Sequence, residues 1–270
     1  MSQHHYIESM LDRFNMSDCN PVRTPFPQGF EALPATDEEG QIAKEFRYRE
    51  IVGSLLYLST IARPDISHAI GTLCRSMSKW NSKHIAAAEH ILRYVKGTNT
   101  LALTFKRSVN SDPMGFADAD WAVDQSNSRS TTGYLFSSFG GLICWKSRLQ
   151  PTVAMSTTEA EYIASSDATR QAIWLPNLLP DISFGQSLPL VIYNDNQGCI
   201  ALIVNDPENH EETKHIRIRY HSLQEKVVEF KTISLVHIAS ENSLADLLTK
   251  YIPRDKFIQL RDGLHLQNLS

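Results

Sequence analysis

The sequence predicts an α/β fold, in which a mixed sheet flanked by helices follows a mostly helical N-terminal region. In the first hundred residues apolar side chains recur at intervals of three and four, which is the period of a helix. After Gly97 the pattern changes to short runs with the twofold alternation of strands. One almost wholly apolar run, at 188–193, is typical of a strand buried on both faces in the parallel part of a sheet.

The composition is that of a globular protein with a sizeable core. The chain has 270 residues, of which 42% are hydrophobic and 21% charged. No stretch reaches the roughly eighteen apolar residues of a membrane span, and the first ten residues lack the order of a signal peptide. We therefore expect a cytoplasmic or nuclear protein without a membrane partner. The four cysteines are far apart and form no Cys-x-x-Cys pair, which argues against structural zinc and disulfides.

The N-terminal region is expected to contain several helices joined by one long polar loop. Amphipathic spacing predicts a first helix at 6–14, and a proline-rich, acidic loop follows it. A buried helix is expected at 51–61 and another at 83–96, which Gly97 ends. Between them the Arg-Pro-Asp sequence breaks the chain and starts a further helix, with Asp65 as its predicted N-cap.

In the remainder of the chain, segments with the twofold period of strands alternate with segments that have the period of helices. Gly140 and Gly141 mark a hairpin turn between two of the strands. Strands followed by a long helix, a strand, helices, a strand and a last helix form the pattern of an α/β sheet with helices on its faces. Strands are expected at 101–105, 114–119, 131–139, 142–145, 188–193 and 233–238, and helices at 157–179, 197–204, 214–229 and 243–250.

Charge is distributed unevenly along the chain. Residues 71–110, here called the basic block, hold seven Lys or Arg and one acid, a net +6, whereas the other 230 residues hold 19 basic and 29 acidic side chains, a net −10. A basic segment beside an acidic remainder is typical of a phosphate-binding surface next to a carboxylate metal site. A solvated helix face is the alternative. The candidate phosphate contacts are Arg75, Lys79, Lys83, Arg93 and Lys96.

Four acids stand at the ends of predicted elements. Asp118 closes a strand, Asp195 follows the apolar strand, Glu161 lies in the first turns of the long helix, and Asp246 lies in the last short helix. An α/β sheet presents its ligand-binding groups at such strand ends and helix starts. Carboxylate oxygens are the ligands that hard divalent cations prefer, and two such cations about 4 Å apart can promote hydrolysis of a phosphodiester. These four residues are therefore candidate catalytic metal ligands.

Helix geometry separates the two glutamates of the long helix. Positions two apart lie about 200° apart around a helix. Glu161 is in register with the small and apolar stripe that should face the sheet, so it points inward. Glu159 then points largely to solvent, where it can take part in capping with Ser156 or Thr157. Spacing alone leaves Asp118 and its neighbour Asp120 as rivals.

Six motifs resemble the ribonuclease H domain of copia-type retrotransposon polyproteins, and they occur in the order of that family. Two further motifs, YREIVGSLLYLSTIARPDI (48–66) and HILRYVKGT (90–98), resemble the segment that follows the polymerase palm in the same polyproteins. The resemblance covers nearly the whole chain. The six motifs are GFADADWA (115–122), STTGYLF (130–136), AMSTTEAEYIA (154–164), YNDNQGCI (193–200), TKHIRIRYH (213–221) and ENSLADLLTK (241–250).

The resemblance implies a fold, a domain division and an activity. It implies a ribonuclease H-like mixed five-stranded sheet flanked by helices at 112–252, preceded by a thumb- or connection-like helical region at 1–107 and followed by a C-terminal tail or helix at 253–270. It implies hydrolysis of the RNA strand of RNA/DNA hybrids with two Mg²⁺ ions, for which Mn²⁺ can substitute. The implied ligands are Asp118, Glu161, Asp195 and Asp246, which favours Asp118 over Asp120.

The same resemblance limits what to expect of this chain. The family's polymerase motif Tyr-Val-Asp-Asp does not occur in the sequence, so we expect a polyprotein fragment without polymerase activity, with the polymerase part as a candidate partner. Glu212 and Gln224 stand where the family commonly has Arg. An inactive remnant that only binds hybrid or a polymerase is the main alternative. A transposase or integrase is a second, although four ligands and no His-His-Cys-Cys element count against it.

Three further residues are candidates for contact with nucleic acid. Asn196 and Gln197 lie next to a ligand and at a helix start, from which they can reach the minor groove and its 2′-hydroxyls. Lys214 lies in TKHIRIRYH. Zinc binding by the nearby histidines is disfavoured because no paired cysteines accompany them. Those histidines are His210, His215 and His221.

Overall fold

The computed structural model describes residues 1–27, 30, 46–106, 112–121, 128–181, 189–205 and 222–268. The chain forms two compact units. The first contains Met1–Thr104 and Lys250–Ser270, and the second contains Phe105–Val123 and Ser128–Thr249. Across the described ranges, no helix combines the length and the apolar character needed to span a membrane.

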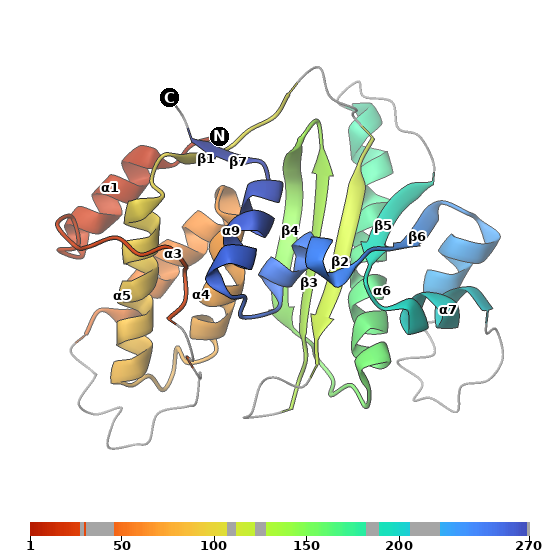
Figure 1. Ribbon diagram of the computed structural model, residues 1–270, viewed down its shortest axis with the longest axis horizontal. Helices are drawn as coiled ribbons and strands as arrows, with labels where there is room; N and C mark the ends of the chain where they lie inside the picture. The colour runs from red at the N-terminus through yellow and green to blue at the C-terminus, as the bar shows by residue number, and fades with distance from the viewer. Residues whose placement is uncertain are drawn as a thin grey trace. The chain divides into compact units, whose positions relative to one another are not determined.

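The first unit is mostly helical. Its N-terminal amine donates a hydrogen bond of 2.5 Å to the carbonyl of Leu103, and a two-stranded antiparallel sheet lies beside the two chain ends (Figure 1). The elements are α1 (His4–Arg13), α3 (Tyr48–Ile61), η1 (Pro64–Ile66), α4 (Ser67–Cys74), α5 (Ser82–Gly97), α9 (Arg254–Gly263), β1 (Leu101–Leu103) and β7 (Leu266–Asn268).

The C-terminal segment is an integral part of this helical unit. The rings of Phe257 on α9 and Tyr94 on α5 meet edge to face, with 5.8 Å between their centroids. Phe257, Leu260 and Leu264 are buried. Because β1 pairs with β7, the strand expected at 101–105 belongs to this small sheet and not to the large one. The segment expected to be a C-terminal tail or helix thus contributes α9 and β7 to the first unit, as far as its described residues 253–268 extend.

Asp65 does not cap a helix, and that prediction is wrong. Helix α4 begins at Ser67, its N-cap is Ile66, and no side chain caps it. Asp65 is instead buried against Arg63, whose Nε and Nη2 donate to its two oxygens at 2.9 and 2.7 Å. Tyr94 donates to the same carboxylate at 2.7 Å. The buried guanidinium of Arg63 needs a counter-charge in the core, and an unpaired buried charge costs more free energy than the loss of a helix cap.

The second unit contains a five-stranded mixed sheet with the order β4-β3-β2-β5-β6. Strand β3 pairs antiparallel with both β2 and β4, whereas β5 is parallel to both β2 and β6. The predicted apolar strand thus lies inside the parallel half of the sheet. The strands are β2 (Met114–Asp120), β3 (Thr131–Ser138), β4 (Gly141–Leu149), β5 (Leu190–Asn194) and β6 (Ile233–His237).

The two faces of this sheet carry different elements. On one face, Ala117 of β2 packs in a buried cluster with Ala168 and Ala172 of the long helix α6 (Thr157–Asp181). Because side chains alternate along a strand, Asp118 points to the other face. There the short 3₁₀ helix η4 (Leu244–Leu248) lies on β2 and β3. The predicted fold class, a mixed five-stranded sheet flanked by helices and preceded by a helical region, is confirmed.

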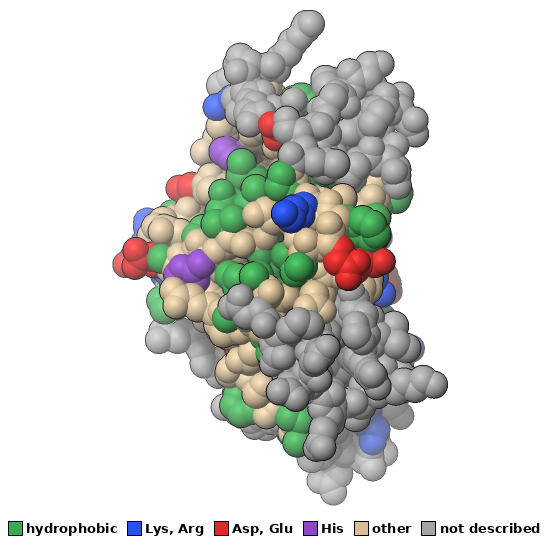
Figure 2. Space-filling view, turned by 90° about the vertical axis from the view of Figure 1, so that its right-hand side faces the viewer, with side chains coloured by type: hydrophobic (Ala, Val, Ile, Leu, Met, Phe, Trp, Pro, Cys, Tyr) green, Lys and Arg blue, Asp and Glu red, His purple; other side chains and the backbone are tan. Residues whose placement is uncertain are grey.

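The remaining helices complete the second unit. The expected helix at 197–204 is α7 (Gln197–Asn205). Of the expected helix at 214–229, the first part lies outside the described residues and the last part is the π-helix η2 (Glu225–Glu229). The side of this unit with α6, α7 and β6 shows apolar side chains mixed among polar ones (Figure 2). Apolar groups dispersed in this way are ordinary for a protein surface.

Candidate metal centre

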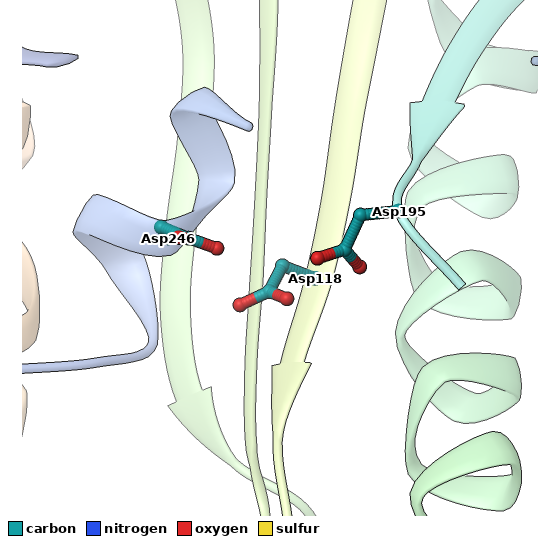
Figure 3. A group of neighbouring side chains, drawn as sticks. All are labelled: Asp118, Asp195 and Asp246. Atoms are coloured by element: carbon teal, nitrogen blue, oxygen red, sulfur yellow. The ribbon is translucent and has the colours of Figure 1, made fainter. Parts of the chain in front are cut away.

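Three of the four predicted ligands meet at one point. Asp118 on β2, Asp195 directly after β5 and Asp246 on η4 each offer one carboxylate oxygen, and these oxygens all lie within 4.8 Å of one another. Figure 3 shows the three side chains pointing toward one another, with Asp118 in the middle. Asp118 and Asp246 are buried, while Asp195 is partly exposed. The cluster is therefore accessible to solvent at the Asp195 side.

The parallel pairing of β2 and β5 brings the first two aspartates together. Phe116 pairs with Tyr193 in this ladder. Asp118 and Asp195 each follow two residues later, so both strands deliver a carboxylate to the same edge of the sheet. This is where open α/β sheets bind their ligands. Spacing along the chain predicts the strand ends, but only the pairing makes them neighbours.

Two hydroxyl groups bind the aspartates, and no periodic pattern in the sequence singles them out. Thr249, immediately after η4, donates a hydrogen bond to Oδ2 of Asp118. Ser240 donates to Oδ2 of Asp195 at 2.6 Å. Both residues are small, and both come from the chain around the last ligand. The sequence signal that could have identified them is their position within a few residues of Asp246.

Glu161 lies beside this cluster with both of its oxygens hydrogen-bonded. Oε1 accepts from the backbone N–H of Ala119 at 3.1 Å, and Oε2 accepts from Nδ2 of Asn194 at 3.0 Å. Its side chain is buried, so the inward orientation predicted from the helix face is confirmed. The oxygens of Glu161 are not among the three that converge. Its role as a fourth ligand remains a prediction.

The environment of Glu161 strongly favours its protonated form. Burial raises the pKa of its carboxyl group well above the ordinary value of 4.5. The negative charges of Asp118 and Asp195 raise this pKa further. The hydrogen bonds from Asn194 and Ala119 act in the opposite direction. Crowded carboxylates of this kind need a positive charge to become fully ionised together.

Glu159 has the capping role predicted for it. Ser156 Oγ accepts a hydrogen bond from the Glu159 backbone N–H at 3.1 Å, and Glu159 Oε2 accepts one from Met155 N at 2.6 Å. These two bonds satisfy backbone donors at the start of α6. The two glutamates are thus divided between helix capping and the carboxylate cluster. Asp120, the rival of Asp118, is not in the cluster.

The predicted phosphate contacts differ in their surroundings. Lys79 and Lys83 are exposed. Arg93 and Lys96 are partly buried and donate to the carbonyls of Asn20 and Cys19 at 2.7 and 2.8 Å. These last two side chains hold the N-terminal segment against α5. Arg75 is partly exposed, and Lys214 lies outside the described residues.

The two predicted minor-groove residues lie at the start of α7. Oδ1 of Asn196 accepts a hydrogen bond from the backbone N–H of Cys199 at 2.8 Å. Asn196 therefore caps the helix with one end of its amide. Gln197, the first residue of α7, is exposed. Their contact with nucleic acid stays a prediction.

Comparisons with known proteins find similar sequences over almost the whole chain. A retrovirus-related Pol polyprotein from transposon TNT 1-94 of Nicotiana tabacum is 41% identical over 98% of this chain. A retrovirus-related Pol polyprotein from transposon RE1 of Arabidopsis thaliana is 35% identical over 95% of it. The chain spans 20% and 17% of the lengths of these two relatives. No family model matches the chain.

Solved structures resemble the chain more distantly. RNase H1 from Halobacterium salinarum NRC-1 is 16% identical, with a TM-score of 0.37, and the match covers 51% of this chain and 94% of that one. The foamy viral protease-reverse transcriptase in complex with RNA/DNA hybrid is 14% identical, with a TM-score of 0.41, over 76% of this chain and 27% of that one.

Proposed function

This chain belongs to the retrovirus-related Pol polyproteins of transposons, and from that premise we propose that it is their ribonuclease H. Its predicted reaction is endonucleolytic hydrolysis of the RNA strand of an RNA/DNA hybrid. The single observation that carries the proposal is the convergence of Asp118, Asp195 and Asp246 within 4.8 Å. The proposed catalytic domain is 112–252, and the proposed thumb- or connection-like region is 1–107.

The donor set fits a hard divalent cation. All three converging groups are carboxylates, and oxygen ligands of this kind suit Mg²⁺ or Mn²⁺. Among the residues that the structure describes, this is the one such group of three or more acids, histidines or cysteines. When bound, a pair of cations neutralises charge on the scissile phosphate and lowers the pKa of water. Glu161 is the proposed fourth ligand, since its buried carboxylate points inward beside the cluster, where Ala119 N and Asn194 Nδ2 donate to its two oxygens.

Two hydroxyl groups hold the carboxylates of the site in place. Thr249 binds one oxygen of Asp118, and Ser240 binds one oxygen of Asp195. Asp195 is partly exposed and so lies where a phosphate can approach. Gln197 and Asn196 follow it directly and are the proposed contacts to the 2′-hydroxyl groups that distinguish RNA from DNA.

The proposal extends to how the substrate is held. We assign phosphate binding to Lys79 and Lys83 of the basic block, because both side chains are exposed and positively charged. Arg75, Arg93, Lys96 and Lys214 complete the proposed set. The polymerase part of the polyprotein is a proposed partner of this chain.

Cleavage of a hybrid whose RNA strand carries a label tests the function. The full chain should cut the RNA in Mg²⁺ and stop when EDTA is added, while single-stranded RNA and a DNA duplex of the same sequence stay intact. Tight binding of the hybrid without cleavage in Mg²⁺ or Mn²⁺ would instead identify an inactive hybrid-binding remnant. Cleavage of the DNA duplex would identify a transposase- or integrase-like activity.

A further inference from the structure

Thr249 is a buried residue that lies next to Asp118 and to the helix that carries Asp246. Its side chain is fully buried, as is that of Asp118, to which its hydroxyl donates. Thr249 also follows η4, the helix that carries Asp246. The hydroxyl makes longer contacts of 3.4 and 3.3 Å with the carbonyls of Ala245 and Asp246. A hydroxyl has one proton to donate, and the charged carboxylate of Asp118 is a stronger acceptor than either carbonyl.

The methyl group of Thr249 rests on a glycine of the neighbouring strand. Gly133 of β3 is paired with Asp118 of β2. A Cβ atom at Gly133 would lie 2.6 Å from Cγ2 of Thr249 and 2.8 Å from Cβ of Leu248. Real Cβ atoms essentially never approach another carbon so closely. The missing side chain at 133 therefore lets η4 lie directly on the sheet, within reach of Asp118.

We propose that Thr249 is a positioning residue of the metal centre, which fixes the carboxylate of Asp118 by holding its Oδ2. A carboxylate can rotate about its last side-chain bond, and that torsion is broad in the absence of a partner. The hydroxyl removes this freedom and leaves the second oxygen of Asp118 for a cation shared with Asp195 and Asp246. Thr249 acts through Asp118 alone, because it is buried and cannot touch nucleic acid.

This inference rests on the proposed metal-dependent function, and Mn²⁺ binding separates the two. Residues that hydrogen-bond metal ligands typically contribute about 10–100-fold to affinity. In the full chain without nucleic acid, Thr249→Val should weaken Mn²⁺ binding, measured by calorimetry, by about that factor, since it keeps the shape and loses the hydroxyl. Cleavage should show a lower kcat in Mg²⁺ with an unchanged KM for hybrid.

A second pair of variants isolates the hydroxyl if the valine variant fails to fold. Thr249→Ser and Thr249→Ala both lack the methyl group and differ only in the oxygen. The serine variant should bind Mn²⁺ within about threefold of the wild type, and the alanine variant about 10–100-fold more weakly. Equal affinities in either matched pair would overturn the positioning role while leaving the metal site intact. A wild-type chain that binds no Mn²⁺ would refute the metal site itself.

Discussion

Asn194 donates a hydrogen bond of 3.0 Å from its side-chain amide to Oε2 of Glu161. The same amide lies 3.2 Å from Oγ of Ser165, and its Oδ1 accepts from the backbone N–H of Asn196 at 2.7 Å. A buried, uncharged side chain thus connects the long helix to the strand end that carries Asp195. Asn194 holds the Glu161 carboxyl group by a hydrogen bond but carries no charge that could balance an ionised carboxylate. The net charge of the carboxylate cluster therefore depends on pH and on bound cations.

The first prediction concerns the pH dependence of stability in EDTA. The pKa of Glu161 is raised above 4.5 in the folded chain, so the folded state holds this proton more tightly than the unfolded state. Its contribution to the free energy of unfolding should be fully present below about pH 4.5 and should be lost as pH rises through the raised pKa. Urea denaturation at several pH values should show this loss in the wild type and not in Glu161→Gln.

The capping glutamate is the control for that measurement. Glu159→Gln removes an acid of the same helix that lies outside the carboxylate cluster, so the loss assigned to Glu161 should persist in that variant. Identical pH profiles for the wild type and Glu161→Gln would show that Glu161 is not the group responsible.

The second prediction concerns the partly exposed ligand. Asp195→Asn should abolish cleavage of the hybrid in Mg²⁺ and change hybrid binding little, because it removes one shared carboxylate but few phosphate contacts. Labelled-RNA cleavage and filter binding on the same protein measure both quantities. Glu159→Gln, outside the cluster, should stay within about tenfold of the wild-type rate because a cap substitution costs stability rather than chemistry. Wild-type cleavage by Asp195→Asn would remove Asp195 from the site.

The third prediction tests the contact between η4 and the sheet. Gly133→Ala should displace η4, weaken Mn²⁺ binding and lower the free energy of unfolding by about 1–3 kcal/mol, the usual cost of overpacking. Gly53→Ala is the matched control, since a Cβ atom at Gly53 in α3 meets nothing within 4 Å. That change should stabilise the chain by about 0.5–1 kcal/mol through helix propensity. Full metal affinity in Gly133→Ala would show that η4 tolerates the methyl group.

The fourth prediction separates two kinds of basic side chain in the basic block. The double variant Lys79→Ala and Lys83→Ala should weaken hybrid binding. The slope of the logarithm of the binding constant against the logarithm of salt concentration should become shallower by roughly 0.9 for each lost phosphate contact. Arg93→Ala should reduce stability as well as hybrid binding, because Arg93 also holds the carbonyl of Asn20. Binding titrations at several salt concentrations and thermal melts distinguish the two outcomes. An unchanged salt slope in the lysine variant would assign both residues to an ordinary solvated surface.

The fifth prediction concerns the buried pair in the first unit. Asp65→Asn should destabilise the chain by about 3–5 kcal/mol, because it leaves the buried guanidinium of Arg63 without its counter-charge. If Asp65 were a helix cap, the same change would be nearly neutral, since Asn caps as well as Asp. Urea denaturation of the variant decides between these outcomes.

The sequence by itself determined the strands of the large sheet, the long helix and the orientation of several side chains. The periods of apolar residues placed the strands of the large sheet and the long helix, and the helix face distinguished inward Glu161 from capping Glu159. The position of Asp195 directly after its strand was likewise predictable, whereas Asp118, expected to close its strand, lies two residues before the end of β2. These features depend on neighbours within a few residues, and a local pattern can record them.

Tertiary structure decided which distant groups meet. Thr249 and Asp118 are 131 residues apart in sequence, and their contact depends on the space above Gly133. Asp65 became an ion-pair partner because folding buried Arg63, and β1 found its partner in β7 at the other end of the chain. Such contacts follow from complementary shape and charge across the folded core. No period along the chain carries that information, because it depends on how separate elements pack against one another.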